Sequence, residues 1–90
     1  MVDPQAESTE TEFRPNVLTD KQSTQLAEWF VYHAPSADDC MRYERITIAA
    51  KQLARVIMET CPQCADQSAA LRLVREARMT ANASIACKGV

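Results

Sequence analysis

Apolar residues recur every three to four positions along two long stretches of the chain, which is the spacing of helices that bury one face. From about 37 to 60 the recurring residues are Tyr43, Ile46, Ala50, Leu53 and Ile57. From about 67 to 87 they are Ala70, Leu73, Val74, Ala77, Ala81 and Ile85. A shorter stretch, roughly 20–31, places Leu26, Trp29 and Phe30 at i, i+3 and i+4. The pattern predicts an all-α chain with one short and two long helices.

Residues that favour helix starts precede each of these stretches. Thr19, with Gln22 three positions later, is typical of a capping box, in which side chains and backbone groups satisfy each other. Ser36 is the expected cap of the second helix and Asp66 the expected cap of the third.

Residues that interrupt helices separate the stretches. Pro35 follows the short helix, and a residue that precedes proline avoids the α region. Pro62 ends the second helix, and Lys88-Gly89 resembles a helix-stopping sequence. The loop around Pro62 is so short that the two long helices should form an antiparallel hairpin.

A hairpin plus one short helix offers a thin core, and chains of this size usually need disulfides, a metal or partner subunits. Apolar residues also lie off the main stripe of both long helices, namely Met41, Ile48, Leu71 and Met79. Apolar side chains on two faces indicate two partners for each helix, so we expect a homo-oligomer in which hairpins pack on hairpins. The simpler interpretation is that these four side chains are exposed, as single apolar residues often are.

Composition narrows the classes of function. The chain has 90 residues, of which 47% are hydrophobic and one is Gly. A single Gly argues against a turn-rich all-β fold and against a Gly-rich phosphate loop. The sequence contains neither an apolar run long enough to cross a membrane nor the hydrophobic run of a signal peptide. We therefore expect a cytoplasmic protein.

The net charge of −2 is unevenly distributed. Residues 1–20 carry five acids and one Arg, whereas residues 40–90 carry eight bases and four acids. Residues 1–18 are rich in Glu, Ser, Thr and Pro, which predicts a flexible acidic arm before a helical-hairpin domain at 19–90. The basic body suggests an anionic partner, and a solvated helix surface would explain the same charges.

The four cysteines invite a metal or redox interpretation. Cys61 and Cys64 form a CxxC pair. Cys40 and Cys87 belong at the other end of the hairpin, on the order of 30 Å away at 1.5 Å per helical residue, so one chain cannot gather all four around a metal. A thioredoxin-like site places its CxxC between a strand and a helix, and no strand is evident. We expect no metal site and cysteines that pack as buried, small apolar residues.

No catalytic constellation stands out. The one His is His33, and no GxSxG, HExxH or P-loop motif is present. Ser36 and Asp38 fit better as residues of a helix start. We therefore expect a protein that is not an enzyme and needs no cofactor.

Aromatic and basic residues are the best candidates for a binding site. Phe30 and Tyr32, whose rings can stack on a base, precede the hairpin. Thr47 and Lys51 follow on one shoulder of the second helix, and Arg45 lies on its other shoulder. A cleft between copies would combine stacking with charge-assisted phosphate contacts. The simpler interpretation assigns Phe30 to the core and the basic side chains to surface ion pairs.

Several short segments resemble one family of phage proteins. They are FVYHAP at 30–35, RYERI at 42–46, AAK at 49–51, CP at 61–62, AL at 70–71, REA at 75–77 and MTANASIA at 79–86. Over roughly residues 26–87 the chain is similar to the helical-hairpin domain shared by phage anti-CBASS and anti-Thoeris proteins. It departs from the family pattern at Thr47, where a basic residue is common, and at Thr80, where Trp often stands.

The resemblance implies a sponge, which is a protein that binds the cyclic nucleotide signals of bacterial immunity and keeps them from effector proteins. Family members assemble as multimers, commonly hexamers, with cyclic dinucleotides between protomers and, in some members, cyclic trinucleotides at a separate three-fold site. By position, Phe30 and Tyr32 are the candidates for stacking, and Arg45, Thr47 and Lys51 for phosphate or base contacts. Cyclic ADP-ribose isomers are a further ligand class, and the expected location is the cytoplasm of an infected bacterium.

Two other functions stay open on the residues alone. A non-catalytic helical hairpin can bind another protein through its apolar faces. A hairpin without nuclease activity can bind DNA, but the dispersed basic residues and the acidic arm argue against a grip on duplex phosphates.

Overall fold

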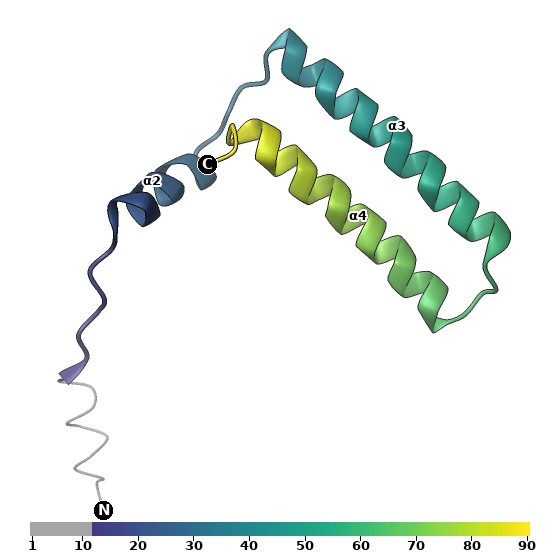
Figure 1. Cartoon of the computed structure of the whole chain (residues 1–90), viewed down its shortest axis with the longest axis horizontal. Coiled ribbons are helices and arrows are strands. Elements are labelled where there is room, and N and C mark those ends of the chain that lie inside the picture. The colour runs from purple at the N-terminus through teal and green to yellow at the C-terminus, as the bar shows by residue number, and fades with distance from the viewer. Residues whose placement is uncertain (1–11) are drawn as a thin grey trace, which may run out of the picture.

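The computed structural model describes residues 12–90, and the elements labelled in this range are helices (Figure 1). α2 spans Asp20–Trp29, α3 spans Ala37–Thr60 and α4 spans Ala65–Ala86. The prediction of one short and two long helices is confirmed for this part of the chain. Most of the predicted acidic arm, residues 1–11, lies outside the described residues. Within 12–90, no helix is both long enough and apolar enough to cross a membrane.

The N-terminal caps of α2 and α3 are those predicted. The hydroxyl of Thr19 accepts the N–H of Gln22 at 3.1 Å, and the Gln22 side chain accepts the N–H of Thr19 at 3.0 Å. Ser36 and Asp39 form the same reciprocal pair at the start of α3, with both bonds at 3.1 Å. These bonds satisfy backbone donors that have no partner inside a helix, which is why the sequence marks both starts so clearly.

Two boundaries differ from the prediction. α2 ends at Trp29 rather than near residue 31, because Phe30 has already left the helical region at φ −113° and ψ 24°. α4 begins at Ala65, and its N-cap is Cys64 rather than the predicted Asp66. Asp66 instead lies in the first turn of α4, where the positive end of the helix dipole stabilises its carboxylate. The Cys64 side chain makes no capping hydrogen bond.

α3 and α4 lie side by side and run in opposite directions (Figure 1). A tight turn at 61–64 joins them, and Gln67 Nε2 donates to the backbone oxygen of Cys61 across it at 3.1 Å. At the far end of α4, Gly89 adopts a φ of 78° and donates its N–H to the oxygen of Ser84 at 2.9 Å. A positive φ is readily available to glycine, so the predicted stop signal is confirmed.

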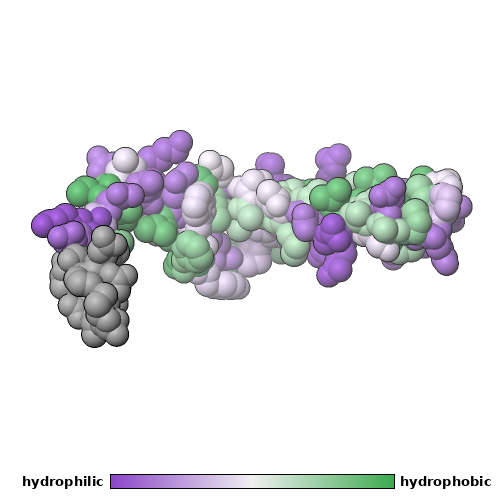
Figure 2. Space-filling view, turned by 90° about the horizontal axis from the view of Figure 1, so that it is seen from below, coloured by the Kyte–Doolittle hydropathy of each residue, from purple (hydrophilic) through white to green (hydrophobic). Residues whose placement is uncertain are grey.

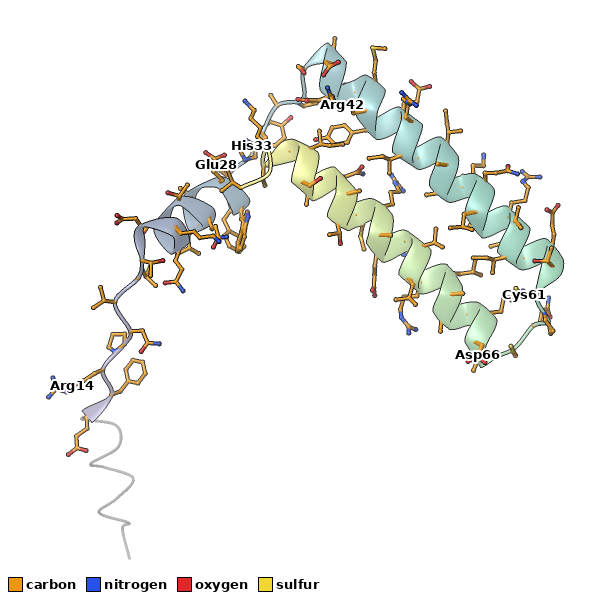
Figure 3. The ribbon with its side chains drawn as sticks, in the orientation of Figure 1. Arg14, Glu28, His33, Arg42, Cys61 and Asp66 are labelled. Atoms are coloured by element: carbon orange, nitrogen blue, oxygen red, sulfur yellow. The ribbon has the colours of Figure 1, made fainter. Side chains whose placement is uncertain are left out.

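The C-terminal end of α2 is held against the last residues of the chain. The indole Nε1 of Trp29 donates to the backbone oxygen of Val90 at 2.8 Å. The backbone oxygen of Glu28 accepts from His33 Nε2 at 2.7 Å and from Cys87 Sγ at 3.6 Å. Figure 3 shows Glu28 and His33 beside the end of α4. Two of these hydrogen bonds, from Trp29 and from Cys87, therefore hold α2 against the end of α4, and the third ties the following loop to α2.

The chain is too thin to enclose a core. Its radius of gyration is 21.2 Å, against about 12 Å for a compact domain of this length. Within the described residues, only Cys87 is buried, and 9% of its surface remains exposed. Leu53 and Leu73, on the predicted apolar stripes, remain 52% and 59% exposed. Figure 2 shows apolar residues at the surface along the length of this thin body.

The uncapped start of α4 leads to a stability prediction. Cys64→Ser supplies a hydroxyl at the N-cap, where Ser is among the most favourable residues, and should stabilise the fold by about 0.5–1 kcal/mol. Cys61→Ser is the matched control, because Cys61 follows the end of α3 and its hydroxyl would not cap α4. Urea denaturation followed by circular dichroism at one protein concentration measures both variants. Equal shifts in the two variants would mean that the hydroxyl does not cap α4.

Candidate functional site

A groove between α3 and α4 gathers most of the unpaired positive charge of the two helices. It has a volume of about 250 Å³. Its polar lining consists of Thr47, Lys51, Arg75 and Arg78, and its apolar lining consists of Ala50, Ala54 and Val74. We call it the cationic groove.

Helix geometry places these side chains together. Thr47 and Lys51 are four residues apart on α3, and Arg75 and Arg78 are three apart on α4, so each pair lies on one helix face. Because α3 and α4 run side by side, the two pairs face a common space. Thr47 is partly buried at the floor, and the three cations are exposed. A hydroxyl and three exposed cations are thus available to one bound molecule.

The cations of the groove lack acidic partners. Over residues 12–90, the ion pairs formed by arginines are Arg42 with Asp38 at 2.7 Å and Arg72 with Glu76 at 3.9 Å. In this range no carboxylate lies within ion-pair distance of Lys51, Arg75 or Arg78. Guanidinium and ammonium groups prefer phosphate or carboxylate partners. The cationic groove is therefore suited to an anion.

A second polar cavity, at the open end of the helices, is different because its charges are already compensated. It is lined by Asp38, Asp39 and Arg42 among others. The hydrogen bond to Asp38 raises the pKa of Arg42. Hydrogen bonds from the backbone and then the hydroxyl of Ser36 lower the pKa of Asp39. These groups stabilise the start of α3, and they leave little net charge to attract a ligand.

The other side of the contact between α3 and α4 is apolar. A groove of about 480 Å³ runs along it, lined by Ile46, Ala49, Ala50, Leu53, Leu73, Val74, Ala77, Arg78 and Ala81. We call it the apolar groove. At 100° per residue, Ala49 and Leu53 lie on one side of the contact line and Thr47 and Lys51 on the other. The two grooves are thus opposite sides of one helix pair, and Arg78 borders both.

The predicted site residues fall into two groups. Thr47 and Lys51 come together in the cationic groove. Arg45 projects from the other shoulder of α3 and does not line that groove. Phe30 and Tyr32 lie between α2 and α3 with 80% and 83% of their surface exposed. The simpler interpretation of Phe30 as a core residue is therefore wrong for the single chain.

Arg75 and Arg78 were not among the predicted site residues. Their three-residue spacing indicated a shared face, but not that this face would meet Thr47 and Lys51. That relation depends on the register of α4 against α3. Counting residues outward from the turn along both helices would have indicated that Arg75 and Arg78 lie beside Thr47 and Lys51.

The cysteines form no metal centre in the described part of the chain. No group of three or more His, Cys, Asp or Glu side chains is placed to hold an ion there. Figure 3 shows Cys61 at the opposite end of the long helices from His33. All four thiols are free, and only Cys87 is buried. The expectation of buried, apolar cysteines is therefore wrong for Cys40, Cys61 and Cys64, because a two-helix layer has no interior to receive them.

Comparison with known protein families identifies the domain. Residues 22–86 match the family model described as Acb2/Tad1, hairpin domain. The match covers most of the chain and includes all of α3 and α4. Neither a curated protein nor a solved structure matches the chain. The resemblance seen in the short sequence motifs is thereby confirmed.

Free cations in the groove lead to a prediction about anions. Inorganic pyrophosphate should shift the amide resonances of Thr47, Lys51 and Arg75 more than those at the open end. Lys51→Gln should weaken this binding roughly fivefold, because an exposed ion pair contributes at most about 1 kcal/mol. Arg42→Gln is the control, because the cation of Arg42 is already paired. Nuclear magnetic resonance titrations at low salt measure both variants, and an equal loss would refute the groove as the preferred anion site.

Proposed function

The chain belongs to the Acb2/Tad1 hairpin-domain family, the sponges of phage anti-CBASS and anti-Thoeris proteins, and we propose that it binds and sequesters a cyclic oligonucleotide signal of bacterial anti-phage defence. The observation that carries the proposal is the cationic groove, with three unpaired cations and a hydroxyl on one face. Cyclic dinucleotides are the first ligand class, and cyclic trinucleotides and cyclic ADP-ribose isomers are further ones. All of these join bases to negatively charged phosphates.

The phosphates of the ligand occupy the cationic groove. Lys51 and the two arginines donate charge-assisted hydrogen bonds to phosphate oxygens, and Thr47 donates its hydroxyl. The groove's volume of about 250 Å³ is below the ~300–1,000 Å³ of pockets that enclose whole small ligands. One chain therefore holds part of the ligand, and the rest contacts a neighbouring copy.

The exposed aromatic residues complete the site from a second chain. Phe30 and Tyr32 offer ring faces that are largely open in the single chain, and a base stacked on such a ring gains about 1–3 kcal/mol. Arg45, on the other shoulder of α3, contributes to the site of the adjacent copy. Phe30, Tyr32 and Arg45 thus join the cationic groove of the neighbouring copy in a stacking and charge-pairing site between protomers.

Copies assemble through the apolar groove. Half-exposed Leu53 and Leu73 line it, and the small side chains of Ala49, Ala77 and Ala81 let another helix approach closely. Burying apolar surface contributes about 25 cal/mol per Å². A single thin chain leaves much of its apolar surface in water, and contact with another copy would bury it. We take the assembly to be a homo-oligomer, with the hexamer common in the family as the expected form.

Sequestration requires no chemistry. A protein that binds its ligand tightly lowers the free ligand by mass action, so affinity and abundance are sufficient. The proposed action is non-enzymatic and needs no cofactor, and it takes place in the cytoplasm of the infected bacterium.

The apolar groove also favours one alternative function. The apolar groove has a volume of about 480 Å³ and is uncovered in the single chain. In the alternative function, this groove binds a different protein instead of another copy of the chain. The cationic groove would then have no selective affinity for cyclic nucleotides, so a measurement of that affinity distinguishes the two functions.

Calorimetry tests the binding function. Cyclic dinucleotides, a cyclic trinucleotide and cyclic ADP-ribose isomers are titrated side by side, and at least one should bind with a Kd on the order of 1 µM or tighter. Denaturing the loaded protein should release that nucleotide intact. Tyr32→Ala and Arg45→Ala should each weaken binding by roughly tenfold while assembly persists, and Phe13→Ala, another exposed aromatic residue outside the domain, should not. Absence of binding across the panel refutes the sponge, and a cleaved nucleotide indicates an enzyme.

Analytical ultracentrifugation tests the assembly. The wild-type chain should sediment as an oligomer at micromolar concentration. Leu73→Glu places a charge in the apolar groove, where an unpaired carboxylate is costly to bury, and should shift the protein to smaller species. Val17→Glu, at a residue that is almost fully exposed before α2, is the control. A wild-type monomer with full helicity at low concentration would contradict the proposed assembly.

A further inference from the structure

A second pocket extends the cationic groove along α3 toward the turn. It has a volume of about 440 Å³ and is lined by Lys51, Ala54, Arg55, Met58 and Glu59. Lys51 and Ala54 line both spaces, so the pocket and the groove adjoin each other. A molecule whose phosphate is held by Lys51 can therefore place its next group in this pocket.

The floor of this pocket suits a flat ring. Ala54 is small and partly buried, and Met58 is largely exposed. A methionine thioether makes favourable contacts with aromatic rings and adapts its shape to them. The space of about 440 Å³ is lined by residues of α3 alone and is open to solvent, so it can receive a flat ring on one side without enclosing it. A nucleobase fits both the chemistry and the size of the space.

The polar edge of the pocket is formed by Arg55 and Glu59. They are four residues apart on α3, a spacing at which opposite charges often pair. At the same spacing Arg42 pairs with Asp38, and Arg72 with Glu76. In the described chain Arg55 and Glu59 form no such pair. Both groups therefore keep their hydrogen-bonding capacity for a ligand.

An ionised carboxylate accepts hydrogen bonds and donates none. Guanine presents two adjacent donors, N1–H and N2–H, on its Watson–Crick edge, whereas adenine presents an acceptor at N1. A guanidinium donates to guanine O6 or N7 in a geometry common in nucleic-acid recognition. The pair of Glu59 and Arg55 thus matches guanine and mismatches adenine.

We propose that Arg55, Met58 and Glu59 form a base pocket that selects a guanine-containing cyclic dinucleotide. The inference rests on the proposed function, since it requires a phosphate of the same ligand in the cationic groove. Glu59 accepts the two donors of the base, Arg55 donates to its carbonyl side, and Met58 covers one ring face.

Calorimetry with cyclic di-GMP and cyclic di-AMP tests the pocket. The wild-type protein should bind cyclic di-GMP at least roughly tenfold more tightly, because a site built to hydrogen-bond a group discriminates against a ligand that lacks it. Glu59→Gln replaces the carboxylate by an amide, which pairs well with adenine. The ratio of the two affinities should therefore fall roughly tenfold in this variant, with affinity for cyclic di-AMP retained or increased.

Glu44→Gln is the matched control, because Glu44 is an exposed glutamate on the same helix that lines none of these spaces. It removes the same charge and should leave the ratio unchanged. Binding of both ligands with no preference, or a ratio that Glu59→Gln does not alter, overturns the base pocket and leaves the sponge function standing. Binding of neither dinucleotide while a cyclic trinucleotide binds also overturns the pocket alone. Absence of binding across the whole panel overturns the sponge function together with the pocket.

Discussion

A layer of two helices has no interior. α3 and α4 meet along one line, so the side chains next to that line keep one flank uncovered. Stabilisation by burial scales with the apolar area removed from water, and among the described residues only Cys87 is buried, with 9% of its surface still exposed. A helix cap contributes only about 1 kcal/mol, so caps fix where the helices begin without replacing the missing core. The two uncovered sides of the helix pair are consequently the surfaces that can contact another molecule.

The sequence fills these two sides differently. On one side Leu53 and Leu73 stand among alanines, which gives a shallow apolar surface that another helix can approach. On the other side Thr47, Lys51 and Arg75 give a polar surface of one charge sign. Surface ion pairs elsewhere on the long helices show that the chain can neutralise its arginines locally, and on this side it does not. In the proposed function, packing between copies uses the apolar side and anion recognition uses the cationic side.

Much of this arrangement could be predicted from local sequence, because local signals determine it. The capping residues Thr19 and Ser36 bond to groups three positions away, and both predicted helix starts were correct. The four-residue spacing likewise predicted that Thr47 and Lys51 share a face. The start of α4 was missed because Asp66 is a common cap and Cys64 is not. The exposure of three cysteines was missed because the prediction assumed a core that one chain does not form.

What local pattern could not supply is the register between the two long helices. The part played by Arg75 and Arg78 depends on which turn of α4 lies beside Lys51, and the turn at 61–64 sets that relation. The same register places Arg78 at the border of both grooves, with its apolar stem able to cover one side while its charged head serves the other. In the proposed assembly a ligand that binds only between copies stabilises the oligomer, and by reciprocity the oligomer strengthens binding of the ligand. Assembly and sequestration are then one linked equilibrium, so the apparent affinity for the ligand depends on the concentration of the protein itself.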